Sequence, residues 1–187
     1  MAYILDANVF IQAKNLHYGF DFCPAFWDWV TRKNAAGRVI SIERIGDELQ
    51  AGADELTEWS KRMGGRLFVP PDAAMLGTLP QVSTWVSSQS YSAAAVNTFL
   101  QVADYYLVAR ALAHGDVVVT HEVAAESVHK VKIPNVCIGM GVKCMNPYEM
   151  LRVERARFVL APPAGSDHAT EAGPHHVDEA GPRGADR

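Results

Sequence analysis

Short apolar runs alternate with segments of helical periodicity from the start of the chain to about residue 154, and this alternation constrains the fold more than any other feature. The clearest apolar run is residues 116–120, Asp-Val-Val-Val-Thr, whose consecutive valines are typical of a strand buried on both faces. Strands that alternate with helices form largely parallel sheets with helices on both sides. The sequence therefore predicts an α/β protein, a three-layer α/β/α sandwich with a mainly parallel central sheet.

The positions of the expected elements follow from apolar spacing and from capping residues. Strands are expected at residues 2–5, 38–41 and 116–120, with one or two more at 134–138 and 142–145. Helices are expected at residues 9–14, 24–35, 42–50, 73–76 and 82–86, across 92–114 as one or two helices, and after the caps Asp54 and Asn146. The pattern of residues 67–69 is ambiguous.

Composition indicates one domain followed by a tail. The chain has 187 residues, of which 49% are hydrophobic, and this is enough for one packed core but leaves little room for two. Residues 161–187 are rich in Pro, Gly, Ala, His and acids, with Val177 as their only large aliphatic side chain. Such a segment buries too little apolar surface to offset its ordering entropy. We predict a domain at 1–154, a linker at 155–160 and a disordered tail at 161–187.

Charge and cysteine content exclude several classes of protein. Of the 17 Lys and Arg and the 21 Asp and Glu, two and five lie in the tail, so the body carries 15 against 16. Bulk positive charge therefore does not hold it to nucleic acid. No apolar run approaches the roughly 20 residues that span a bilayer, and the N-terminus lacks the basic region of a secretory signal. Three cysteines without a C-x-x-C pair predict reduced thiols, and the location predicted is cytoplasmic.

Two acidic positions follow expected strands directly. Asp6 ends the first strand, and Glu122 lies in the corner after residues 116–120. In parallel sheets, ligands bind outside the carboxyl ends of the strands. A third acid, Glu48, lies about 90° from the centre of its helix's apolar stripe, where an i,i+4 ion pair with Arg44 explains it equally well. Each acid alone has a structural explanation.

Asp104 is harder to explain as a structural residue. It lies within the apolar stripe of the expected helix, which consists of Leu100, Leu107, Val108 and Ala111. Burying an unpaired carboxylate costs several kcal/mol, so Asp104 must be paired with an arginine, protonated or bound to a cation. It can cap a helix only if the helix breaks near Gln101. These conditions favour a functional acid.

Four acids from separate elements are thus candidates for one site: Asp6, Glu48, Asp104 and Glu122. If they converge, their repulsion raises their pKa values unless a divalent cation neutralises them. Carboxylates without a Cys or His ligand set favour Mg²⁺ or Mn²⁺. Such a centre activates water for the hydrolysis of a phosphodiester bond.

The order of four segments resembles the PIN domain family. The segments are Ile-Leu-Asp6-Ala-Asn8-Val-Phe-Ile, Asp47-Glu48-Leu49, Ala-Asp104-Tyr-Tyr-Leu-Val-Ala-Arg-Ala and Val-Val-Thr120-His-Glu122. The resemblance covers roughly residues 1–154. It is nearest to an uncharacterised PIN-like branch whose signature runs from Lys132-Ile-Pro-Asn-Val-Cys137 to Val142-Lys-Cys144.

The resemblance implies a Mg²⁺- or Mn²⁺-dependent endoribonuclease, a hydrolase of RNA, which in many bacterial members is a VapC-type toxin of a toxin–antitoxin pair. RNA is then the substrate and a protein antitoxin the partner, while a homodimer is left open. The catalytic and metal-binding positions implied are Asp6, Glu48, Asp104 and Glu122. The supporting polar positions implied are Asn8 and Thr120. The family usually has Asp where Glu122 stands, and the alternatives for this fourth acid are Glu126 and Asp116.

An alternative from another class is a catalytically inactive PIN-like module that binds protein or RNA. Such a module tends to lose its acids, whereas all four positions here are acidic. Trp27 and Trp29 point in different directions on their helix, so one of them is a candidate for an exposed binding residue, although core filling is the default. A phosphotransfer or receiver-like domain built on Asp6 would need a second acid beside it, and Asn8 stands there.

Substrate contacts are only weakly marked in the sequence. Basic residues that are candidates for phosphate contacts are Lys61, Arg62, Arg66, Lys130 and Lys132. Charges alternate around them, so a solvated face explains them equally well. His121 borders the acidic positions and is expected to be a surface loop histidine.

Overall fold

The structure is a computed structural model that describes residues 1–159. Its centre is a five-stranded parallel sheet of order β3-β2-β1-β4-β5. The strands are β1 (Tyr3–Leu5), β2 (Val39–Ile42), β3 (Phe68–Val69), β4 (Val117–Val119) and β5 (Cys144–Met145). In the central strand β1, Ile4 pairs with Ile40 on one side and with Val118 on the other. Of the three inner strands, β1 and β4 are almost completely buried, as their apolar sequences require.

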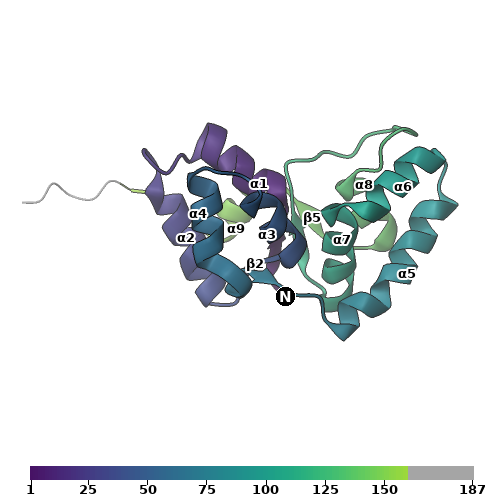
Figure 1. The fold of residues 1–187 in the computed structure, drawn as a ribbon, viewed down its shortest axis with the longest axis horizontal. Coiled ribbons are helices and arrows are strands. Elements are labelled where there is room, and N and C mark those ends of the chain that lie inside the picture. Colours follow the sequence, from purple (N-terminus) through teal and green to yellow (C-terminus); the bar gives the residue numbers. More distant parts are fainter. Residues whose placement is uncertain (160–187) are drawn as a thin grey trace, which may run out of the picture.

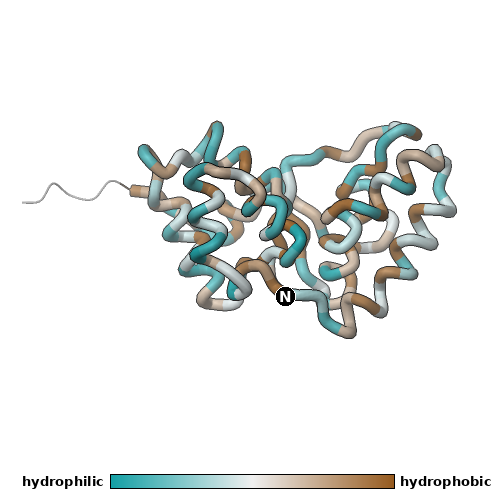
Figure 2. The backbone as a smooth tube through the Cα atoms, viewed as in Figure 1, coloured by the Kyte–Doolittle hydropathy of each residue, from teal (hydrophilic) through white to brown (hydrophobic). Residues whose placement is uncertain are grey.

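Helices cover both faces of the sheet. They are α1 (Ala7–Gln12), which continues as a π-helix (Ala13–His17), α2 (Pro24–Ala35), α3 (Glu43–Gln50), α4 (Glu55–Met63), α5 (Ala73–Ser88), α6 (Ala93–Gln101), α7 (Ala103–His114), α8 (Ile133–Met140) and α9 (Pro147–Val153), with a 3₁₀ turn at Gly64–Arg66. Figure 1 shows α1, α2, α4 and α9 on one side of the strands and α5 to α8 on the other. Hydrophilic residues are frequent along α3 and α4 (Figure 2). The predicted three-layer α/β/α sandwich is confirmed.

Local signals placed several elements correctly. Helix α2 has the predicted bounds, with Pro24 in its first turn, where a missing N–H is harmless. Asp54 caps α4 by accepting a hydrogen bond from the Thr57 amide. Asn146 caps α9 by accepting one from the Glu149 amide, and the Glu149 carboxylate accepts one from the Asn146 amide in return. Capping chemistry therefore fixed these helix starts.

One predicted strand is part of a helix, and two predicted helices form a single helix. Residues 134–138 form part of helix α8, not a strand, because Ile133, Val136 and Cys137 bury one face at helical spacing and Gly141 ends the helix in a left-handed conformation. Residues 73–76 and 82–86 belong to one helix, α5, which accommodates Pro80 in its interior. The ambiguous residues 67–69 contain the short edge strand β3.

The aromatic segment before and within α2 is part of the core. Trp27 is 3% exposed and Trp29 is 6% exposed, so the alternative of an exposed tryptophan is wrong. Both are covered because the preceding loop folds back: Phe20 stacks on Trp27 with ring centroids 4.0 Å apart. Phe158 packs edge-on against Tyr18 and so keeps the chain in contact with the domain after α9.

All three cysteines are free, as predicted. No helix among residues 1–159 is long and apolar enough to cross a membrane. The tail predicted at 161–187 lies outside the described residues, and the division into domain, linker and tail stays a prediction.

Candidate active site at the carboxyl end of the sheet

Strands β1 and β4 end side by side, and this places Asp6 next to Thr120. Leu5 pairs with Val119, the last residue of β4. The Thr120 hydroxyl donates a hydrogen bond of 2.7 Å to Asp6 Oδ2 and accepts bonds of 3.0 Å from Asn8 Nδ2 and the Glu122 amide. These three bonds use the donor and both lone pairs of the hydroxyl. Asn8 and Thr120 therefore fix the Asp6 carboxylate in one orientation.

Asp6 is a buried carboxylate in an acidic environment. Its side chain is only 5% exposed. Burial, as the main cause, and the charges of Asp104 and Glu122 raise its pKa to about 7, although the Thr120 hydrogen bond acts in the opposite direction. Asp6 forms no ion pair with a base within residues 1–159. Its ionised form thus lacks a compensating positive charge from the described chain.

Asp104 lies in the first turn of α7. The predicted long helix breaks, because Val102 has extended backbone angles between α6 and α7. Leu100 therefore belongs to another helix, and the single apolar stripe assumed from the sequence is wrong, although Leu107 and Val108 are buried as expected. The N-terminus of a helix favours an anion, so the break gives Asp104 partial compensation.

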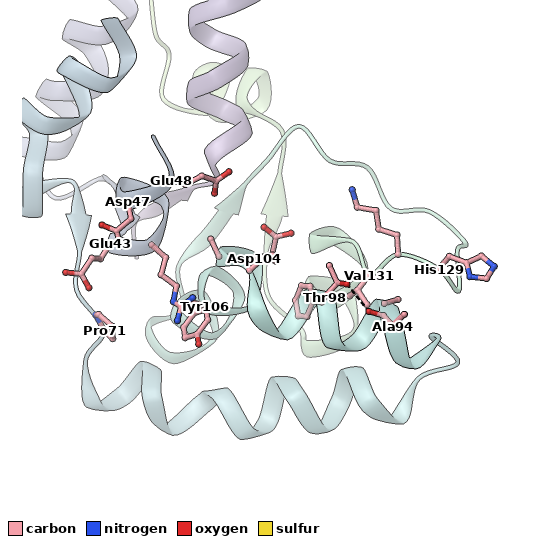
Figure 3. A pocket seen from close by; sticks show the side chains of 16 residues that line it. Glu43, Asp47, Glu48, Pro71, Ala94, Thr98, Asp104, Tyr106, His129 and Val131 are labelled. Atoms are coloured by element: carbon pink, nitrogen blue, oxygen red, sulfur yellow. Dashed lines mark hydrogen bonds between the residues drawn. The ribbon is translucent and has the colours of Figure 1, made fainter. Parts of the chain in front are cut away.

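The electrostatic surroundings of Asp104 connect it with the other acids. Burial, first, and the charges of Glu122 and Glu48 raise its pKa to about 6, while Lys130 lowers it. The arginine partner considered as its structural explanation is absent from the ion pairs of residues 1–159. Figure 3 shows Glu48 and Asp104 pointing into the same space between α3 and α7. Asp104 thus lies within electrostatic reach of Asp6, Glu48 and Glu122, and Asp6 lies within reach of Glu122 as well.

Glu48 is exposed on α3, and the expected ion pair with Arg44 does not occur in the described part of the chain. Arg44 instead lies over the Tyr106 ring, with its Cζ atom 3.8 Å from the centroid. Glu48 is therefore available to the groove between the helices.

Glu122 is engaged by its own loop. Its Oε1 accepts a hydrogen bond of 2.8 Å from Lys132, and its Oε2 accepts one of 3.0 Å from the Ile133 amide at the start of α8. Both carboxylate oxygens are therefore used. Of the two alternatives for the fourth acid, Glu126 is exposed and Asp116 lies at the opposite edge of the sheet, where β4 begins.

A groove of about 1010 Å³ opens beside Asp104 and Glu48. Its walls come from α3, α6, the first turn of α7 and the loop before α8 (Figure 3). The charged side chains that line it are Glu43, Arg44, Asp47, Glu48, Asp104 and Lys130. The groove therefore offers both acidic and basic side chains to a charged ligand.

A second polar group beside Asp6 was underestimated from the sequence. His121, expected to be a simple surface residue, packs with His17 and Tyr148, with ring centroids 5.6 and 5.7 Å away. The Tyr148 hydroxyl and His17 Nε2 are 2.9 Å apart, and burial lowers the pKa of His121. His17 ends the π-helix, a structure often found at functional sites.

The donor set fits a divalent ion with few protein ligands. In residues 1–159, no three side chains of His, Cys, Asp or Glu lie close enough together to hold a metal ion. Mg²⁺, however, keeps several waters and is bound in proteins through one or two carboxylates. Asp6 and Asp104 can supply these carboxylates, since both are oxygen donors without a basic partner in an ion pair. A site enclosed by all four acids does not fit the arrangement described.

Comparisons with known proteins give a family and one distant fold relative. A family model described as "Domain of unknown function (DUF4411)" matches residues 3–158. A crystal structure of FitAcB from Neisseria gonorrhoeae is similar with a TM-score of 0.46 and 16% sequence identity, over 78% of this chain and 98% of that chain. A search of curated proteins gives no match.

Proposed function

The chain belongs to the family described as domain of unknown function (DUF4411), and from its site we propose that it is a PIN-like, metal-dependent endoribonuclease. One observation carries the proposal. Asp6 and Asp104 are carboxylates at the carboxyl edge of a parallel sheet, they have raised pKa values, and neither has a basic partner in an ion pair of the described chain. Uncompensated carboxylates at such an edge favour a cation site over a structural role.

The proposed cofactor is Mg²⁺ or Mn²⁺. Asp6 and Asp104 would hold it, with Glu48 and Glu122 as outer acids that act through water. When bound, such an ion polarises the phosphate and lowers the pKa of a water molecule. Thr120 keeps Asp6 oriented toward the site through its hydrogen bond to Asp6 Oδ2, and Asn8 in turn holds the Thr120 hydroxyl. Lys132 holds Glu122 back from direct coordination.

RNA is the proposed substrate, and a protein antitoxin of the VapC type the proposed partner. The groove beside Asp104 supports a polymeric substrate because it extends past the acids to Thr98 and His129. The antitoxin rests on the sequence resemblance alone, and the cytoplasmic location rests on the cysteine content.

A catalytically inactive binding module is the second candidate. The specific observation in its favour is that Glu122 is fully occupied by Lys132 and the Ile133 amide. Within residues 1–159, moreover, no three potential ligands gather. The two functions differ in whether metal and acids are needed for any activity.

Hydrolysis of a panel of tRNA and single-stranded RNA separates the two functions. The purified full chain is incubated with Mn²⁺, Mg²⁺ or EDTA beside the variants Asp6→Ala and Asp104→Ala. The matched control is Asp47→Ala, which removes an exposed acid from the same groove. The nuclease predicts cleavage that needs the metal, falls at least about 100-fold in both variants and persists in the control.

Two results would count against the nuclease. Cleavage in EDTA, or cleavage retained by folded Asp104→Ala, would mean that the acids do not carry the reaction. Absence of cleavage together with an unchanged melting temperature on adding Mn²⁺ would favour the binding module.

A further inference from the structure

Arg44 has acidic neighbours on its own helix but does not pair with them. Glu43 precedes it, and Asp47 and Glu48 follow at the i+3 and i+4 positions that usually form ion pairs on a helix. Among residues 1–159, none of these acids lies within ion-pair distance of its guanidinium. Arg44 instead lies over Tyr106 of α7 at 3.8 Å. At that distance the guanidinium is held on the ring face and its N–H groups are not consumed by carboxylates.

The stacked pair lies in the same groove as the proposed metal ligands. Arg44, Tyr106 and Asp104 all line it, and Lys130 lines it as well. In Figure 3, Tyr106 is on one side of Asp104 and His129, the neighbour of Lys130, is on the other. The Lys130 side chain is 64% exposed, and its amine lies 3.7 Å from Glu122 Oε1. The groove thus contains two cations beside its acids, and Arg44 forms no ion pair within residues 1–159.

The charge of the groove makes these two positions selective. Four of its lining side chains are acidic, namely Glu43, Asp47, Glu48 and Asp104, against Arg44 and Lys130. A polyanion is repelled by such a lining and is accepted only where a positive charge lies. Arginine binds phosphate through two parallel N–H bonds at the rim of its plane, which stacking of one face on an aromatic ring leaves free. A phosphate group therefore binds in this groove only beside Arg44 or Lys130.

We propose that Arg44, held on Tyr106, is a phosphate-binding subsite for a nucleic-acid strand, on the α3 side of the phosphate that reacts at Asp104. This inference rests on the proposed nuclease function and deepens it. The substrate class is a strand that continues past the cleavage site toward α3. Lys130 contacts the strand on the opposite side. Because the subsite positions the strand, it acts on binding and not on the chemical step.

Kinetics of a labelled 12-nucleotide single-stranded RNA in Mn²⁺ test the subsite. Arg44→Gln raises KM about tenfold, as expected for losing hydrogen bonds to a charged group, with kcat changed less than about twofold since both ground and transition states lose the contact. The slope of log(kcat/KM) against log[NaCl] becomes shallower by about 0.7, the value for one phosphate contact on a single strand. Arg44→Lys keeps the slope but has an intermediate KM because it lacks the planar fork.

Three control variants separate contact from folding. Tyr106→Phe keeps the ring and should match the wild type, whereas Tyr106→Leu removes the support and should raise KM. Arg32→Gln removes an exposed arginine of α2 that does not line the groove and should leave KM and the salt slope unchanged. Arg44 is exposed, so its variants should melt within a few degrees of the wild type.

The outcomes distinguish the subsite from the nuclease. If the wild type cleaves the RNA and Arg44→Gln has the same KM and salt slope, the subsite is overturned and the nuclease stands. If the wild type cleaves nothing, fluorescence anisotropy of the same RNA with Mn²⁺ decides: binding weakened by Arg44→Gln supports the subsite, and equal binding or none overturns it. A KM raised equally by Arg32→Gln would mean bulk charge, which also overturns it.

Discussion

Two buried aspartates lie at opposite ends of the neighbouring parallel strands β1 and β4. Asp6 follows β1 and Asp116 precedes β4, and both are 5% exposed. Asp116 accepts a 2.7 Å hydrogen bond from the Ala2 amide and lies 3.8 Å from Arg110 Nε. Asp6 has a neutral hydroxyl as its partner and the charges of two further acids nearby. The two aspartates are therefore equally buried but have opposite electrostatic surroundings, and their partners identify Asp116 as the structural one.

At the amino end of β4, the charged side chains form ion pairs with one another. Arg110 also pairs with Asp72 at 3.0 Å, and Asp72 caps α5 through the Met75 amide at 2.9 Å. His114 approaches the same carboxylate. This set joins α5, α7 and β4, so charge at this edge serves packing. The carboxyl edge has no such base for Asp6 or Asp104 in the described chain, which leaves its charge available for a ligand.

The largest predicted difference between the two aspartates is their response to pH. The pKa of Asp6 is raised from 3.8 to about 7 in the folded protein, so folding binds a proton in that interval. The metal-free protein is therefore most stabilised by Asp6 near pH 4 and loses on the order of 4 kcal/mol of that contribution as the pH rises through 7. Urea unfolding in EDTA from pH 4 to 8 measures it. Wild type and Asp6→Asn giving parallel stability curves would refute it.

Removal of Asp116 should destabilise the protein, unlike removal of the Asp6 charge. Asp116→Ala leaves Arg110 without its buried partner and is expected to cost about 3 kcal/mol. Asp6→Asn should not destabilise the protein at pH 8, because its amide oxygen still accepts the Thr120 hydrogen bond. Denaturant midpoints at one pH compare the two, with the exposed Asp28→Ala as reference. A loss below about 1 kcal/mol for Asp116→Ala would remove the structural assignment.

Packing of α8 supports the carboxyl edge, since the loop that carries Glu122 ends at this helix. A Cβ atom added at Gly139 would lie 1.8 Å from Trp85 Cζ2 of α5. Gly139→Ala should therefore cost about 2 kcal/mol through overpacking. Gly77, in the same helix as Trp85, has nothing within 4 Å of its added Cβ, so Gly77→Ala should gain up to about 1 kcal/mol. Thermal melts compare the pair, and equal shifts would contradict the model of close packing.

The smallest effect concerns the partner of Glu122. Lys132→Gln should lower stability by only about 1 kcal/mol, because the pair is partly exposed and the Ile133 amide still bonds Glu122. Lys130→Gln, whose amine is 3.7 Å from Glu122, should change stability less. Chemical denaturation of both variants tests the order. A larger loss for Lys130→Gln would reverse the assignment of the partner.

The sequence predicted most of the fold because its signals were local. Valine runs placed the central strands, and Asp54 and Asn146 fixed the starts of two helices. Residues 134–138 were misassigned because a short apolar run looks the same in a buried helix and a strand. The break at Val102 lies next to Gln101, where the sequence leaves a break open, and no proline or glycine marks it.

The positions of the candidate acids follow from the sequence more than their contacts do. Asp6 and Thr120 lie at the strand ends where a parallel sheet places its site, and Asp104 stands out as an acid among apolar residues. Their role in a metal site stays a prediction. The bonds of Glu122 to Lys132 and the Ile133 amide, and the packing of His17 with His121, depend on long-range folding of loops. No spacing in the sequence contains that information.

Binding of Mn²⁺, followed through the loss of its free-ion paramagnetic resonance signal, tests the central claim most directly. The claim is that Asp6 and Asp104 form a divalent-metal site that Asp116 does not share. The account predicts saturable binding by wild type and Asp116→Asn, weakened at least about tenfold in Asp104→Asn. No binding by the wild type, or equal affinity in Asp104→Asn, would contradict it.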